Sequence, residues 1–151
     1  CKQSLKNLKS DDDHFQAIEW DESLSIGIRE VDRQHQELCE KINAFFYAGI
    51  KDTVQDKAEL LFDFLTDYID AHFQSEEKFM HSIEYPLFDQ HKAIHDKFIK
   101  DYYQLIRESN LYGKNLHFLL LTKEQVIDWL IEHIKTEDKA LGTFSKNRST
   151  I

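Results

Sequence analysis

The sequence lacks several features that define whole classes of protein. Its two cysteines, Cys1 and Cys39, provide no disulfide framework. No apolar run approaches the roughly 18 residues of a membrane span, and no signal peptide is recognisable. These absences predict a soluble, cytoplasmic protein and no membrane insertion by this domain.

Clusters of basic residues are also missing. The formal net charge is −9, and no basic patch offsets it along the chain. A surface that binds nucleic acid needs such a patch, so we expect no nucleic-acid partner.

The length of 151 residues fits one domain with a hydrophobic core. Residues 1–17 are polar and aperiodic, which predicts a tail or linker before a domain at 18–146 and a short C-terminal tail at 147–151. The chain begins with Cys1 rather than methionine. We therefore expect a piece of a longer protein, such as one with fused signalling domains.

The sequence shows neither the alternation of a strand nor an internal repeat. Instead, four segments carry apolar residues at steps of three and four, as amphipathic helices do. Their expected limits are Val31 to Ala48, Asp52 or Thr53 to the residues before Pro86, Phe88 to Glu108, and Thr122 to Gly142. Thr122 and Gln125 have the spacing of a capping box. Four helices and short loops predict an all-α fold, an up-down-up-down antiparallel four-helix bundle.

Histidines interrupt the apolar stripe of every predicted helix. Five of the chain's eight histidines occupy such positions: His35, His72, His91, His95 and His133. One buried histidine usually bonds to a nearby backbone carbonyl, but five unpaired imidazoles would each cost roughly 2–7 kcal/mol. A metal would be a partner common to all five.

The spacing of these residues agrees with metal binding. His91 and His95 are four residues apart, as are His72 and Glu76, so each pair points from one helix toward one centre. Five imidazoles, Glu76 and an acid near His133 exceed a tetrahedral zinc site and suit two six-coordinate ions that share carboxylate bridges. Ferritin-like di-iron sites need Glu-x-x-His pairs, and this sequence has none.

Four segments, in order, give the chain a specific resemblance to the bacterial hemerythrins. They are WDESLSIGIREVDRQH, HFQSEEKFM, YPLFDQHKAIHDKF and WLIEHIKTED, and the resemblance extends from Trp20 to Phe144. It implies that His91, His95 and His133 bind one iron, that His35 and His72 bind the other, and that Glu76 and Asp138 bridge both. It also implies an oxo or hydroxo bridge from solvent and one open coordination position on the second iron.

The acid near His133 is where helix geometry and the resemblance differ. Glu137 is four residues from His133, whereas Asp138 is five residues away, about 140° around a regular helix. The resemblance selects Asp138, which requires a local distortion near the expected helix end at Gly142, and leaves Glu137 in solvent. Leu141 stands where the family often has a tyrosine, so a hydrogen bond from that phenol is expected to be absent.

Apolar side chains flank the predicted ligands and would keep water from a bound ligand. They are Leu38, Phe73, Trp129, Leu130 and Ile134. The alternative is that they are ordinary core of the bundle, and the sequence leaves both interpretations open.

The resemblance implies reversible binding of dioxygen at a non-haem di-iron centre, without catalysis, for oxygen carriage, storage or sensing. The alternative is a di-iron enzyme that acts on peroxide or nitric oxide. Such an enzyme would need a proton donor or a substrate channel at the open iron, and the sequence shows neither near the ligands.

Overall fold

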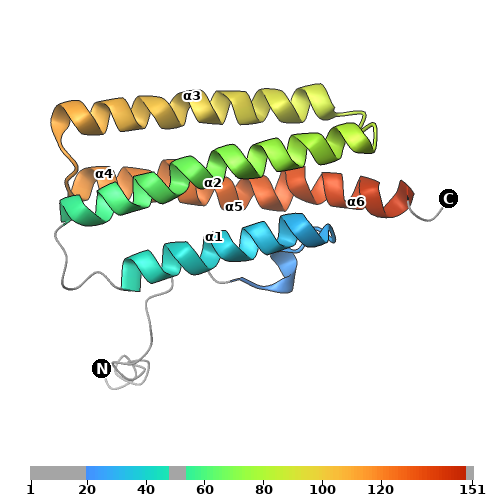
Figure 1. Ribbon diagram of the computed structural model, residues 1–151, viewed down its shortest axis with the longest axis horizontal. Coiled ribbons are helices and arrows are strands. Elements are labelled where there is room, and N and C mark those ends of the chain that lie inside the picture. Colours follow the sequence, from blue (N-terminus) through green and yellow to red (C-terminus); the bar gives the residue numbers. More distant parts are fainter. Residues whose placement is uncertain (1–19, 48–53, 149–151) are drawn as a thin grey trace, which may run out of the picture.

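The computed structural model describes residues 20–47 and 54–148. Its long helices run alternately up and down, side by side, and the fourth rod consists of consecutive segments from α4 to α6 (Figure 1). The elements are η1 (Glu22–Leu24), α1 (Arg29–Tyr47), α2 (Val54–Ser82), α3 (Phe88–Tyr112), α4 (Leu116–Thr122), η3 (Lys123–Asp128), α5 (Trp129–His133), η4 (Ile134–Asp138) and α6 (Lys139–Arg148). The predicted all-α, up-down-up-down four-helix bundle is confirmed.

The first three helices begin and end close to the predicted positions. α1 begins at Arg29, two residues before the expected Val31, and α3 begins at Phe88 as expected and ends at Tyr112, before Gly113. The expected end at Ala48 and the expected N-caps Asp52 and Thr53 lie outside the described residues. So does the tail expected at 1–17.

The carboxylate of Asp32 fixes the segment that enters the bundle. It accepts hydrogen bonds from the backbone N–H groups of Ile26 (2.8 Å) and Gly27 (3.2 Å) and from the hydroxyl of Ser25 (2.7 Å). Gly27 has φ +81°, a conformation that glycine adopts without strain. The chain therefore turns tightly into α1, and this places His35 on the face that looks into the bundle.

The predicted limits of the fourth helix are wrong at both ends. The rod begins at Leu116, where the side chain of Asn115 accepts a hydrogen bond from Phe118 N (3.2 Å) and so acts as the N-cap. Thr122 is inside the helix, and its hydroxyl donates to the carbonyl of Phe118 (2.7 Å). The capping-box pattern therefore did not mark a helix start.

Gly142 does not end the fourth helix either, because α6 continues to Arg148, into the expected C-terminal tail. This glycine permits a close approach: a Cβ at Gly142 would lie 2.0 Å from the carbonyl oxygen of Ile26. The absent side chain lets the entry segment pack directly on α6.

Most of the buried apolar residues that the structure describes form one large cluster, and Met80, Tyr85 and Leu141 form a smaller one. Leu141 is fully buried. None of the described helices is long and apolar enough to cross a membrane.

Candidate metal centre

The fold brings all seven predicted ligands together in the middle of the bundle. Their ligand atoms form two groups, and within each group all of these atoms lie within 4.8 Å of one another. One group is Glu76, His91, His95, His133 and Asp138, and the other is His35, His72, Glu76 and Asp138. All seven side chains are buried. Glu76 and Asp138 belong to both groups, which is the position that bridging carboxylates require.

Three of the four rods position their residues by regular helix geometry. His72 Nε2 lies 3.5 Å from Glu76 Oε2 on α2, one turn apart. His91 and His95, one turn apart on α3, have ring centroids separated by 4.6 Å. His35 of α1 reaches α2, with its Nε2 3.2 Å from that of His72.

The fourth rod positions Asp138 by a change of helix type. Residues Ile134–Asp138 form the π-helix η4, in which hydrogen bonds run from i to i+5 and the turn is wider than in an α-helix. Residues five apart then face the same side, so His133 Nε2 lies 3.0 Å from Asp138 Oδ1. The distortion expected at this place is present, although the helix end that was expected to cause it is not.

Glu137 has a different environment from the one that the sequence suggested. Its side chain is 35% exposed, and Oε2 lies 3.3 Å from the Nδ1 atom of His133, on the outer side of that ring. Glu137 therefore contacts a predicted ligand without entering the cluster.

Two more predicted ligands have a contact at Nδ1, the ring nitrogen that faces away from the centre, and sequence reasoning missed both contacts. Gln34 Oε1 lies 2.6 Å from His72 Nδ1, and Glu77 Oε1 lies 3.1 Å from His95 Nδ1. Glu77 is half-buried and contacts His95 of α3. Both contacts join different helices, so no spacing within one helix could have predicted them.

Aromatic rings cover the histidines of the three-histidine group. Phe73 stacks on His95 with ring centroids 3.8 Å apart, and Trp129 stacks on His133 at 4.8 Å. Leu38, Leu130 and Ile134 are buried in the same apolar cluster as Phe73. Four of the five residues are therefore core of the bundle, and the fifth, Trp129, is partly buried and packs against it. The role of all five as the wall of a ligand pocket stays a prediction.

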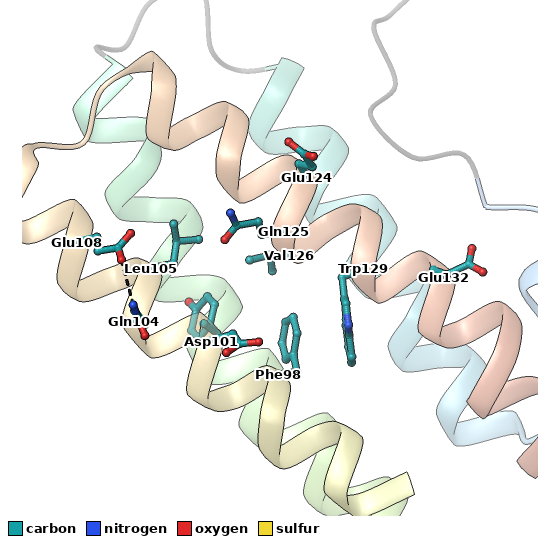
Figure 2. A pocket seen from close by; sticks show the side chains of 11 residues that line it. Phe98, Asp101, Gln104, Leu105, Glu108, Glu124, Gln125, Val126, Trp129 and Glu132 are labelled. Atoms are coloured by element: carbon teal, nitrogen blue, oxygen red, sulfur yellow. Dashed lines mark hydrogen bonds between the residues drawn. The ribbon is translucent and has the colours of Figure 1, made fainter. Parts of the chain in front are cut away.

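A cleft of about 640 Å³ lies on the outer side of this aromatic layer, between α3 and the fourth rod (Figure 2). Phe98 and Trp129 stand side by side at its edge, with ring centroids 4.1 Å apart. None of the seven predicted ligands lines the cleft. Because Trp129 also stacks on His133, its indole separates the cleft from the centre.

A smaller cleft, of about 320 Å³, reaches the two-histidine group. Gln34, Tyr68 and His72 are part of its lining. The Tyr68 hydroxyl donates to the backbone carbonyl of Gln34 (2.8 Å), and the Tyr68 ring stacks on His72 at 5.4 Å. A predicted ligand, His72, therefore lines the surface of this cleft.

The protonation of the cluster follows from burial and close charges. Burial is the main cause that raises the pKa of Glu76, and the negative charge of Asp138 raises it further. Burial alone would raise the pKa of Asp138 as well, but ring nitrogens of His133, His35 and His91 hold it well below its ordinary value. Mainly through burial, the pKa of His72 falls to about 3 and that of His95 to about 4. His72 and His95 are therefore neutral near pH 7, as metal ligands must be.

The donor set fits metal cations. Both oxygens of Glu76, both oxygens of Asp138 and Nε2 of His91 are buried without a hydrogen-bond partner among the described residues. Each unsatisfied buried group costs about 1–3 kcal/mol, and a cation would satisfy all of them at once. The fold and this cluster define a helix-bundle protein with a histidine-rich metal-binding site.

Comparison with known proteins gives the family. The family model described as "Hemerythrin HHE cation binding domain" matches residues 26–144. A bacteriohemerythrin of Stenotrophomonas maltophilia is 31% identical over 125 residues, which cover 80% of this chain and 76% of that protein. A bacteriohemerythrin of Clostridium acetobutylicum is 28% identical over 123 residues (80% of this chain, 95% of the relative). A hemerythrin-like protein of Naegleria gruberi is 29% identical over 119 residues (79% and 86%). The chain belongs to the hemerythrin family.

Proposed function

We propose that this chain binds dioxygen reversibly at a dinuclear non-haem iron centre and is not an enzyme. The observation that carries the proposal is the shared membership of Glu76 and Asp138 in both groups of ligand atoms. A carboxylate has two oxygens and can bind two metals, whereas a single imidazole nitrogen binds one. The family and the names of the relatives support iron as the metal and oxygen as the ligand.

Each side of the cluster would hold one iron. His91, His95 and His133 would bind the first iron, His35 and His72 would bind the second, and Glu76 and Asp138 would bridge them. When bound, two ferrous ions supply the two electrons that reversible binding of dioxygen requires. The second side offers one protein donor fewer than the first, which leaves room there for a small ligand.

The surrounding apolar residues would keep water from the centre. Leu38, Phe73, Trp129, Leu130 and Ile134 carry no ionisable group, so they supply no proton to the centre. A wall without a proton donor favours reversible binding over reduction of the ligand, and this supports an oxygen-binding role rather than an enzymatic one.

The biological use would be oxygen carriage, storage or sensing, the last as one domain of a larger signalling protein. All three uses need the same centre.

Metal analysis of the purified protein tests the proposal. Protein expressed in iron-replete medium should contain about two irons per chain, as the ligand count requires. One zinc per chain and no iron would contradict the dinuclear iron centre.

A further inference from the structure

We propose that Gln34 and Glu77 are positioning residues that give the two sides of the centre different electron-donor strength. Gln34 would accept a hydrogen bond from a ligand of the two-histidine side through a neutral amide. Glu77 would accept one from a ligand of the three-histidine side through a carboxylate. The inference rests on the dinuclear iron centre proposed above and concerns how this chain sets the redox balance between its two irons.

The orientation of the Gln34 amide is fixed by its other contacts. Its Nε2 atom lies 3.3 Å from Glu30 Oε1 and 3.3 Å from Ser75 Oγ. A carboxylate accepts hydrogen bonds and does not donate, so the amide nitrogen must face Glu30 and the amide oxygen must face His72. His72 Nδ1 therefore carries the hydrogen that Gln34 Oε1 accepts at 2.6 Å, and His72 Nε2 keeps its lone pair for the centre.

Glu77 contacts Nδ1 of His95 as Gln34 contacts Nδ1 of His72, but Glu77 carries a negative charge. Its Oε1 atom lies 3.1 Å from His95 Nδ1, and the Glu77 side chain is only 20% exposed. Because a carboxylate only accepts, Nδ1 of His95 donates and Nε2 faces the centre. Glu137 Oε2 lies 3.3 Å from His133 Nδ1 and adds a second negative charge on this side, but that nitrogen makes no hydrogen bond among the described residues.

Among the described residues, no carboxylate is hydrogen-bonded to Nδ1 of either histidine on the two-histidine side. Nδ1 of His35 is buried without a hydrogen-bond partner in the part of the chain that the structure describes. The other ligand on this side, His72, is hydrogen-bonded through Nδ1 to the amide of Gln34. The contrast in hydrogen bonds is therefore between the Glu77 carboxylate behind the first iron and the Gln34 amide behind the second.

This contrast changes how strongly each imidazole donates electrons. A hydrogen bond from Nδ1–H to a charged acceptor is stronger than one to a neutral acceptor, and it makes the imidazole a more basic ligand. A more basic ligand stabilises ferric iron over ferrous iron. The three-histidine side would thus favour the ferric state, while the two-histidine side would keep its iron ferrous more readily.

Two reciprocal substitutions of nearly equal size test the inference. Gln34→Glu gives His72 a carboxylate, and Glu77→Gln takes the carboxylate from His95. The midpoint potential of the two-electron couple would be measured by spectroelectrochemical titration of the iron-loaded protein with dithionite and ferricyanide. We expect Gln34→Glu to lower the potential and Glu77→Gln to raise it, with about two irons per chain retained in both.

Matched controls separate the hydrogen bond from the change of net charge. Gln36→Glu adds the same charge on α1, and Glu40→Gln removes one, both at exposed positions. Their shifts should be clearly smaller than those of the corresponding test variants. Potentials that shift in the same direction in both test variants, or no further than in the controls, would overturn the inference.

Iron content distinguishes this inference from the function on which it rests. A parent protein without two irons would contradict the proposed function. A parent with two irons whose variants show no opposed shifts would contradict the inference alone. If one variant loses iron, the shift in midpoint potential of the other variant tests the inference. Loss of iron from both variants would also overturn the inference, because each replacement keeps an acceptor for Nδ1–H.

Discussion

At the scale of the residue, neighbours in the sequence have different environments. Asp138 is fully buried, and three of the histidines lie within 3.3 Å of its oxygens. Glu137 contacts only the outer nitrogen of one of these rings. The two acids are therefore expected to differ sharply in their effect on the metal.

Alanine at each position tests this difference. Asp138→Ala should lower the iron content well below two per chain, because it removes a donor from both groups of ligand atoms. Glu137→Ala should keep two irons at saturation and weaken metal affinity by about 10–100-fold, the usual effect of losing an outer partner of a ligand. Iron would be quantified after dialysis, and equal losses would contradict the assignment of Asp138.

Leu130 is buried in the apolar cluster, with 2% of its surface exposed. Leu130→Gln leaves all seven predicted ligands in place but allows water next to the centre. The oxygen-dependent absorption band should decay faster to the ferric state, with the iron content unchanged. We would measure the lifetime of this band and the iron content on the same samples.

Leu61→Gln is the control, because Leu61 is equally buried and lies about three turns from His72 on α2. Its band should last as long as that of the parent protein. If Leu130→Gln behaves like Leu61→Gln, then Leu130 is core and not a wall of the pocket.

How much of the site the sequence could predict depended on the range of each interaction. His72 with Glu76, and His91 with His95, follow from spacing within one helix. Asp138 could be chosen only by family resemblance, because its position depends on a π-helix that a regular period does not include. The outer partners Gln34 and Glu77 act across helices, and the sequence alone contains no sign of them.

At the scale of the element, the helix stripes were predictable and the ends of the fourth rod were not. Thr122 and Gly142 have the residue types of a helix start and stop, but packing decides their roles. The hydroxyl of Thr122 bonds within the helix, and Gly142 makes room for Ile26. A local signal cannot distinguish these uses from a cap.

Gly142→Ala tests the packing role of this glycine, because the direction of the change in the free energy of unfolding depends on that role. Alanine favours a helix over glycine by about 1 kcal/mol, so an unpacked position would gain stability. Here the added methyl meets the backbone of Ile26, and we expect a loss of about 1–3 kcal/mol, the usual cost of overpacking. Chemical denaturation would measure the free energy of unfolding.

Thr143→Ala, on the exposed side of α6, is the matched control and should change this free energy by no more than about 0.5 kcal/mol. A Gly142→Ala variant more stable than the parent would show that the close approach to Ile26 is not maintained in solution.

At the scale of the whole molecule, the centre joins all four rods through buried polar groups. Removing the metal would leave those groups unsatisfied, so folding and metal binding should be coupled. A ligand present at a thousand times its dissociation constant stabilises the folded state by about 4 kcal/mol, which corresponds to roughly 10 °C in Tm for a chain of this size.

Chelation of the metal should therefore lower Tm by roughly that amount, as measured by calorimetry. The same chelator should leave the Tm of Asp138→Ala nearly unchanged, because that variant is expected to hold little metal. A parent protein whose Tm does not respond after the metal has been removed would show that the centre does not contribute to the fold.

The most direct test of the central claim is the visible absorption spectrum of the reduced, iron-loaded protein in the absence of air, after exposure to air, and after the oxygen is removed again. Reversible oxygen binding predicts a band that appears with oxygen and disappears when oxygen is withdrawn, on samples with about two irons per chain. A protein that contains both irons but shows no such band, or one that oxidises in a single irreversible step, would contradict the account.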